Sequence, residues 1–344
     1  IDNEDYLIAG NGVYEQAEKL GLKTKVIESD GTELVVIKRT DLNYEDEKRR
    51  KLAIADNATS ESSEWNFEEL TDDEIEEWGI EEHQEEEIQL EAKEDDFVEE
   101  LPEIPITVLG DLYEIGEHRL LCGDSTDSDQ VAKLMNGEKA DMVFTDPPYN
   151  VAFNGRSGKF DVIKNDKLSN TDFEMLIDGM VSIINILNPQ NYYIWCNWKF
   201  YGLLQDKMDF KSCIVWAKNV FGLGRGYRHQ HEFCLFNGKI DNGINNESDL
   251  WEVKKDSNYM HPTQKPVELA SRALNNHKSN KNIVDLFSGS GLTFIASHQL
   301  ERKCYGMELD PKYCDVIIKR MLNLDSKLTI KRNGIDCTED FKTA

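Results

Sequence analysis

The segment from Ile283 to Thr293 constrains the fold more than any other part of the sequence. The strand-like run 283–287 leads directly into Ser288-Gly289-Ser290-Gly291 and then into the start of a helix. Glycine lets the backbone turn sharply and approach a ligand closely. Glu308 follows at the end of the next predicted strand, where a carboxylate can accept two ribose hydroxyls, although an ordinary acid at a helix N-terminus is the alternative. This order predicts a nucleotide-binding α/β domain.

Apolar runs of strand length alternate with helical patterns from residue 106 onward. Such alternation predicts a mostly parallel sheet with helices on both faces. The expected strands are 119–122, 141–145, 192–196, 212–216, 232–236, 283–287 and 303–307.

The net charge of −27 is distributed very unevenly along the chain. Positions 61–103 hold 21 acidic residues and 1 basic residue, whereas positions 104–344 hold 32 acidic and 29 basic ones. Within the acidic segment, Phe67, Leu70, Ile75, Trp78 and Ile80 predict a short amphipathic helix, and 84–100 predicts a self-repelling linker. The alternative to a solvated spacer is a DNA mimic that occupies a basic cleft of this chain or of a partner enzyme. The rest of the chain is nearly neutral, so any affinity for nucleic acid must come from a local basic patch.

The seven cysteines show no Cys-x-x-Cys pair and no spacing typical of a zinc site or a disulfide framework. We expect reduced thiols and a cytoplasmic protein. No apolar run approaches the length of a membrane helix, so no membrane partner is expected.

Residues 1–60 predict a small α/β piece. Leu7-Ile8-Ala9-Gly10, the helical pattern 15–21 and Leu52-Ala53-Ile54-Ala55-Asp56-Asn57 resemble part of a ParB/sulfiredoxin-type N-terminal domain. That family usually carries a Gly-x-x-Arg phosphate-contacting turn, where this chain has Gly10-Asn11-Gly12-Val13. The departure favours a structural or DNA-positioning role over nuclease or nucleotide chemistry.

The tetrapeptide Asp146-Pro147-Pro148-Tyr149 directly follows an apolar run. Its carboxylate can accept a proton, and Pro148 disfavours helical geometry at Pro147, which leaves the Pro147 carbonyl free to accept a hydrogen bond. The Tyr149 ring offers a face for an unstacked base. These groups suit alkylation of an exocyclic amine, whose lone pair is delocalised into its ring.

Two further segments have side chains suited to a polar ligand. His261-Pro262-Thr263-Gln264-Lys265-Pro266 forms a proline-bracketed turn whose hydroxyl, amide and ammonium groups suit a carboxylate. Asp124 ends a strand in Gly123-Asp124-Ser125, where it can contact an adenine edge or act as a helix N-cap.

Together these segments resemble the β-class DNA amino-methyltransferases, in which the catalytic tetrapeptide precedes the cofactor strand, as it does here. The resemblance spans about residues 106–325 and implies a Rossmann-like S-adenosylmethionine-dependent methyltransferase fold acting on double-stranded DNA, with no metal required. It implies that Asp146, Pro147, Pro148 and Tyr149 hold the flipped target base. It also implies a cofactor site made of Asp124, Thr263, Gln264, Lys265, Asp285, Phe287, Gly289, Ser290, Gly291, Thr293 and Glu308.

Residues 222–232 concentrate basic and aromatic groups among glycines. We expect Arg225, Tyr227, Arg228 and His229 to contact DNA. The interval between Phe236 and His261 is short for a target-recognition region. We therefore expect the missing contacts to come from the N-terminal piece, from a second subunit in a homodimer, or from nowhere, in which case sequence recognition is loose.

The sequence thus predicts a ParB-like piece at 1–60, an acidic helix and linker at 61–105, a methyltransferase domain at 106–330 and a tail at 331–344. Adenine N6 is the expected target because the tetrapeptide begins with Asp, whereas Ser there more often accompanies cytosine N4 in the resembling family. Cytosine N4 methylation is one alternative. A DNA-binding, partition-like protein with a vestigial methylase fold is another.

Overall fold

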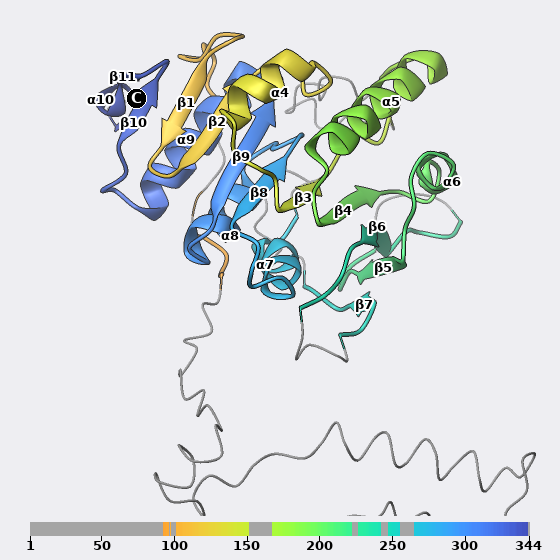
Figure 1. Cartoon of the computed structure of the whole chain (residues 1–344). Coiled ribbons are helices and arrows are strands. Elements are labelled where there is room, and N and C mark those ends of the chain that lie inside the picture. Colours follow the sequence, from red (N-terminus) through yellow and green to blue (C-terminus); the bar gives the residue numbers. More distant parts are fainter. Residues whose placement is uncertain are drawn as a thin grey trace, which may run out of the picture. The chain divides into compact units, whose positions relative to one another are not determined.

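The computed structural model describes residues 92–95, 97, 101–150, 167–221, 226–241, 247–254 and 265–342 (Figure 1). The ParB-like piece expected at 1–60 and most of the acidic segment lie outside these residues. The chain divides into two units, 1–86 and 87–344, and every described residue belongs to the second. The elements of this unit are β1 (Leu112–Ile115), β2 (His118–Cys122), α4 (Ser128–Met135), β3 (Met142–Thr145), α5 (Asn170–Leu187), β4 (Asn191–Cys196), α6 (Tyr201–Gln205), β5 (Ser212–Ala217), β6 (His231–Asn237), β7 (Leu250–Trp251), α7 (Val267–Asn275), β8 (Asn282–Asp285), α8 (Leu292–Gln299), β9 (Lys303–Glu308), α9 (Pro311–Leu324), β10 (Ile330–Arg332), β11 (Ile335–Asp336) and α10 (Thr338–Lys342).

One mixed sheet runs through these elements in the order β11-β10-β1-β2-β9-β8-β3-β4-β6-β5-β7. The five central strands β2, β9, β8, β3 and β4 are parallel. On one side β6 runs antiparallel to both β4 and β5, and on the other side β1 runs antiparallel to β2. The parallel centre with its connecting helices confirms the expected Rossmann-like α/β fold.

Helices cover both faces of the sheet, and the central strands are largely apolar and buried for that reason. Successive residues of β3 alternate between two core clusters. Met142 and Phe144 pack with residues of α7, α8 and α9, whereas Val143 packs with residues of α4, α5 and α6. In Figure 1, α4 and α5 accordingly lie on one side of the strands and α7, α8 and α9 on the other.

The C-terminal residues, which we expected to follow the domain as a tail from 331, extend the sheet instead. β10 pairs with β1 through Ile115 opposite Ile330 and Tyr113 opposite Arg332. The Phe341 ring of α10 is buried and meets the Tyr113 ring edge-on, with 5.9 Å between centroids. Strands of two or three residues carry too little alternation to be recognised in a sequence, and that is why β10 and β11 were not predicted.

The strand expected at 283–287 ends at Asp285. The Leu286 amide donates to Thr145 Oγ1 at 3.1 Å and the Phe287 amide donates to Asp285 Oδ1 at 3.1 Å, so both amides leave the strand pairing. All seven cysteines are free thiols in the structure, and six of them are buried. None of the helices described by the structure has the length and apolar character needed to cross a bilayer.

Replacing Phe341 by Ala should lower the free energy of unfolding by about 3 kcal/mol, because a buried aromatic side chain is lost and a cavity remains beside Tyr113. Urea unfolding followed by circular dichroism measures this change. The matched control is Ile335→Ala in the same segment, since Ile335 is largely exposed. Equal effects of the two substitutions would show that residues 330–342 do not pack as described.

Candidate active site

The parallel strands bring four acidic residues to one edge of the sheet. The β2 and β9 strands end side by side, with Cys122 opposite Glu308, and the Gly123 amide donates to the Glu308 carbonyl at 2.9 Å. Asp124 follows the first of these strands. Asp285 ends β8 and Asp146 directly follows β3, the next strand in the sheet. Ligands of open α/β sheets bind outside this carboxyl edge.

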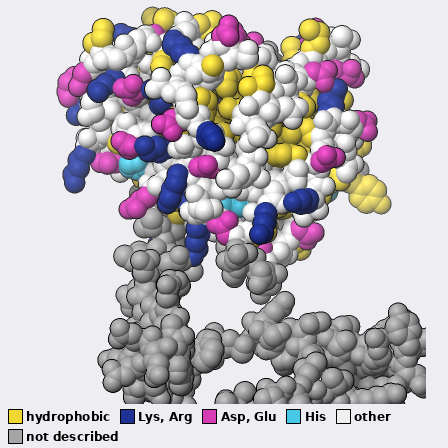
Figure 2. Space-filling view, viewed as in Figure 1, with side chains coloured by type: hydrophobic (Ala, Val, Ile, Leu, Met, Phe, Trp, Pro, Cys, Tyr) yellow, Lys and Arg dark blue, Asp and Glu magenta, His cyan; other side chains and the backbone are white. Residues whose placement is uncertain are grey.

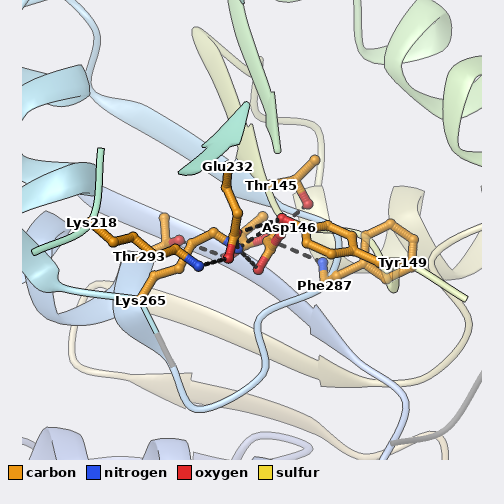
Figure 3. Close-up of polar contacts among 9 residues, drawn as sticks. Thr145, Asp146, Tyr149, Lys218, Glu232, Lys265, Phe287 and Thr293 are labelled. Carbon is orange, nitrogen blue, oxygen red and sulfur yellow. Dashed lines mark hydrogen bonds and ion pairs between the residues drawn. The ribbon is translucent and has the colours of Figure 1, made fainter. Parts of the chain in front are cut away.

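The Asp-Pro-Pro-Tyr tetrapeptide forms a hydrogen-bonded cluster with Lys265, as Figure 3 shows. The Tyr149 hydroxyl donates to Asp146 Oδ1 at 2.7 Å, and the Lys265 ammonium forms an ion pair with Asp146 Oδ2. Lys265 also lies 3.0 Å from the Tyr149 hydroxyl. Lys265 was expected to hold the cofactor, but its ammonium contacts the tetrapeptide.

Glu232 completes this cluster and was not predicted as a site residue. Its Oε2 lies 3.1 Å from the Tyr149 hydroxyl oxygen and 3.1 Å from Lys265 Nζ. Its Oε1 forms an ion pair with Lys218, which follows β5. In the sequence, Glu232 is a single acid directly before the apolar run 233–236. Strand β6 places it at the edge of the sheet where Asp146 lies.

Charge compensation sets the protonation states of the cluster. Removal from bulk water raises the pKa of Asp146, and Lys265 opposes that rise. Burial alone would raise the pKa of Glu232, but Lys265 and Lys218 together lower it to about 2. Burial would lower the pKa of Lys265, yet Asp146 and Glu232 raise it. Lys265 thus stays charged, and Glu232 stays ionised as its counter-ion. Asp146 is the carboxylate that more readily takes up a proton.

The Asp146 side chain keeps 35% of its surface exposed, whereas Lys265 keeps 4%. A carboxylate with that exposure can meet an incoming group, while the ammonium behind it is enclosed by protein. The Tyr149 ring lies against Phe200, with 5.7 Å between centroids. Pro147 is buried and Pro148 is half-buried, so the tetrapeptide is held as part of the fold.

The glycine-rich turn is held from inside by Asp285. The Asp285 carboxylate accepts from Thr145 Oγ1 at 2.9 Å, from Thr293 Oγ1 at 2.6 Å and from the Phe287 amide. Asp285 is only 4% exposed, and burial raises its pKa to about 6. Asp285 and Thr293 therefore hold the turn in place, and the polar groups that they bond belong to the protein itself.

Glu308 organises the other side of the same turn. Its Oε2 accepts from the Gly289 amide and its Oε1 from the Asp310 amide, each at 2.8 Å. Burial raises the pKa of Glu308 to about 7. Gly289 has φ +51° and open space where a Cβ would stand, and Gly291 has φ +88°. The turn thus leaves room beside Glu308 for a ligand.

The remaining predicted residues fall into two groups. Thr263, Gln264 and Arg225 lie outside the described residues. Tyr227 is 99% exposed, and Arg228 and His229 are exposed beside it. Arg228 lies over the Phe221 ring at 4.0 Å and His229 lies 6.1 Å from the Trp198 ring. Across the described ranges, no three His, Cys, Asp or Glu side chains are arranged to hold a metal ion.

Substituting Gln for Glu232 should lower the free energy of unfolding by about 3 kcal/mol at pH 7, because Lys218 and Lys265 lose their shared counter-ion. A carboxylate with a lowered pKa stabilises the fold above its ordinary pKa, and the contribution is lost as the pH falls towards 2. The difference from wild type should therefore shrink between pH 5 and pH 3 in urea titrations. A difference independent of pH would contradict this assignment.

The protein was also compared with known proteins. A family model described as DNA methylase matches residues 140–320. The chain is 27% identical over 262 residues to the Type II methyltransferase M.HpaI of Haemophilus parainfluenzae, covering 65% of this chain and 78% of that protein. It is 27% identical over 233 residues to the Type II methyltransferase M2.LlaDCHI of Lactococcus lactis subsp. cremoris, covering 57% and 87%.

Among solved structures, M1.HpyAVI in complex with SAM is 26% identical, with a TM-score of 0.42 over 58% of this chain and 98% of that one. The cytosine-N4-specific PvuII DNA methyltransferase is 14% identical, with a TM-score of 0.46 over 71% and 94%. The family match contains Asp146, Glu232, Lys265, Asp285 and Glu308, and it covers more than half of the 344 residues. This chain therefore belongs to the DNA methylase family of amino-methyltransferases that act on adenine N6 or cytosine N4.

Proposed function

We propose that this protein transfers a methyl group from S-adenosylmethionine to the N6 amine of an adenine flipped out of double-stranded DNA. The observation that carries the proposal is the Asp146 carboxylate. It is partly exposed at the carboxyl edge of the parallel sheet, has a raised pKa, and is bonded to Tyr149 and Lys265.

The target amine needs an acceptor because its lone pair is delocalised into the base. Asp146 accepts a hydrogen bond from this amine, which helps the nitrogen to become tetrahedral. It then takes the proton that leaves as the nitrogen–carbon bond forms and the carbon–sulfur bond of the sulfonium breaks, with the electron pair of that bond remaining on sulfur. A raised pKa suits that step, since proton acceptors work best when their pKa lies near the working pH. The base must first leave the helical stack, at a cost of a few kcal/mol that contacts in the pocket offset.

An incoming amine shares Asp146 with groups of the protein. Asp146 Oδ1 is bonded to Tyr149 and Oδ2 to Lys265, and each carboxylate oxygen has a further lone pair that can accept from the amine. Glu232 lies 3.1 Å from the same ammonium and keeps its negative charge down to low pH. Lys265 can therefore give up Asp146 without becoming an unpaired buried charge.

The glycine-rich turn and Glu308 fit the cofactor. The methyl group of S-adenosylmethionine is already activated as a sulfonium, so the protein mainly supplies positioning and a site that excludes water. Glu308 holds the Gly289 and Asp310 amides and lies at the end of β9, where a carboxylate suits ribose hydroxyls. Asp124 follows the neighbouring strand β2. Thr263, Gln264 and Lys265 belong to the segment proposed for the methionine end.

Exposed aromatic and basic groups near the same edge suit a DNA strand. Trp198 follows β4, and residues 226–230 precede β6, which pairs with β4 through Cys196 opposite Phe233. Trp198, Phe221 and Tyr227 are exposed, and aromatic rings stack on unpaired bases with little regard to sequence. The face seen in Figure 2 carries Lys and Arg side chains interspersed with acidic ones. The proposed DNA binding therefore depends on the exposed rings and the individual basic side chains near them, because the described residues on that face give no uniform positive charge.

Adenine is preferred over cytosine in this proposal because the tetrapeptide begins with Asp. Cytosine N4 is the alternative target within the same family. We further propose that a ParB-like piece at 1–60 and an acidic linker precede the methyltransferase domain, and that DNA contacts come from the former or from a second copy of the chain.

The test is to incubate wild type, Asp146→Ala and Asp178→Asn with unmethylated DNA and labelled S-adenosylmethionine, and to identify the methylated nucleoside by mass spectrometry. Asp178 is a matched control, since it is an exposed aspartate paired with Lys207 on the surface. We expect N6-methyladenine with wild type and Asp178→Asn. Asp146→Ala should be at least about 100-fold slower, because the proton acceptor is lost.

Three other results would change the proposal. N4-methylcytosine would establish the alternative target. Undiminished transfer by Asp146→Ala would remove Asp146 from the mechanism. No transfer to several DNAs by folded wild type, together with no cofactor binding, would favour a non-catalytic DNA-binding protein.

Cofactor affinity should rise with pH between 6 and 8. The pKa of Glu308 is raised to about 7, so the ribose hydroxyls meet a protonated acid below that value and a carboxylate above it. We expect a gain of roughly 3- to 10-fold, because one titrating group changes affinity by at most tenfold per pH unit. Calorimetric titration with S-adenosylmethionine measures it. Glu308→Gln should bind more weakly and show no such slope; the same slope in the variant would exclude Glu308 as its source.

A further inference from the structure

Three successive residues near the end of the acidic segment, 93–95, are hydrogen-bonded to helices α7, α8 and α9 of the same unit. The Lys93 amide donates to Gln299 Oε1 at 2.5 Å, and Gln299 Nε2 donates to the Lys93 carbonyl at 3.2 Å. Glu94 Oε1 accepts from the Val267 amide. Asp95 forms a two-fold ion pair with Arg320, with distances of 2.7 and 2.6 Å. We call residues 92–95 the strap; it lies ahead of the range matched by the family model.

The Asp95–Arg320 pair is one of the most enclosed ion pairs in the described residues. The two side chains are only 4% and 3% exposed. Arg320 lies on α9, and its third contact is Nη1 donating to the Ser290 carbonyl at 3.0 Å. Ser290 stands between Gly289 and Gly291 in the glycine-rich turn. The Arg320 side chain therefore links the strap to the loop proposed to hold the cofactor.

Glu94 reaches the second part of the same proposed site. Val267 is the first residue of α7, and its N-cap, Pro266, provides no side-chain hydrogen bond. The Glu94 carboxylate supplies that missing acceptor from a distant segment, and its charge is favourable at a helix N-terminus. Lys265 lies two residues before Val267. One short strap thus contacts the start of the helix that follows Lys265 and, through Arg320, is linked to the turn at 289–291.

The chain that follows the strap is also bonded to α9. Asp315, on the same helix as Arg320, accepts from the Ile106 amide at 2.6 Å and the Thr107 amide at 3.1 Å. Ala92 is buried in the core cluster that contains α7, α8 and α9. In Figure 1 the segment coloured orange accordingly enters the domain beside α8 and runs towards β1.

We infer that Asp95 and Glu94 are positioning residues for cofactor binding: through Arg320 and Val267 they hold the glycine-rich turn and the start of α7 in their binding arrangement. The inference rests on the proposed cofactor site. Removing the Asp95 charge leaves Arg320 enclosed without its partner, and an unpaired guanidinium is drawn away from Ser290 towards water. The acidic segment thereby acts on the site through Arg320 and Val267.

The test uses the full chain with Asp95→Asn, and with Glu117→Gln as a control that removes an exposed carboxylate paired with Lys303. Calorimetry measures S-adenosylmethionine affinity at 20 °C, and hydrogen–deuterium exchange measures protection of residues 286–295. We expect Asp95→Asn to weaken affinity at least fivefold and to speed exchange in 286–295. Glu117→Gln should change neither. Glu94→Gln should weaken affinity less and speed exchange at 267–270.

Arg320→Lys covers the case in which Asp95→Asn does not fold. It retains a cation opposite Asp95 but has no planar fork to reach Ser290 as well, so we expect a folded protein with weakened cofactor affinity. Affinity within twofold of wild type in whichever of these variants fold would overturn the inference, even if their melting temperatures fall. Wild type that fails to bind S-adenosylmethionine at all would overturn the proposed function and this inference together, whereas normal binding by wild type and variants alike overturns this inference alone.

Discussion

The buried Asp285 carboxylate is the interaction on which the rest of the site depends. It accepts hydrogen bonds from Thr145 at the end of β3, from Thr293 on α8 and from the Phe287 amide. Thr145 directly precedes Asp146, so a single carboxylate joins the glycine-rich turn to the tetrapeptide. Burial raises its pKa to about 6, and the three donors compensate the burial of the charge.

Charge balance stabilises the neighbouring cluster of Asp146, Glu232, Lys265 and Lys218. Lys265 lies between Asp146 and Glu232, and Lys218 lies on the far side of Glu232. Two ammonium groups facing two carboxylates allow four charges to stand together in a poorly solvated place. The arrangement also gives unequal properties to the two acids, because Glu232 has two cationic neighbours whereas Asp146 has one and is the more exposed. A carboxylate suited to taking up a proton and a structural one thereby arise from the same cluster.

Much of the fold could be predicted because its centre obeys simple periodicities. All seven expected strands exist within one or two residues of their expected ends, since each is an apolar run bounded by turn residues. Four of the described strands, β1, β7, β10 and β11, were not predicted. β7, β10 and β11 have only two or three residues, which show no period, and β1 has only four. The residues of the site likewise divide into those that the sequence predicts and those that it does not. Asp146, Tyr149 and Glu308 stand out at strand ends, whereas Glu232 and Lys218 look like ordinary charges beside an antiparallel pair.

The sequence by itself determined the class of fold, the order of the tetrapeptide and the glycine-rich segment, and the family to which the chain belongs, because these depend on local patterns along the chain. Tertiary structure alone decided which side chains meet. It placed Lys265 on Asp146, brought Glu232 to both, turned Asp285 inward, and bonded Asp95 to Arg320 across more than 200 residues. Such contacts arise where strands and helices from distant positions pack side by side, and no local periodicity encodes the partner of a charged group.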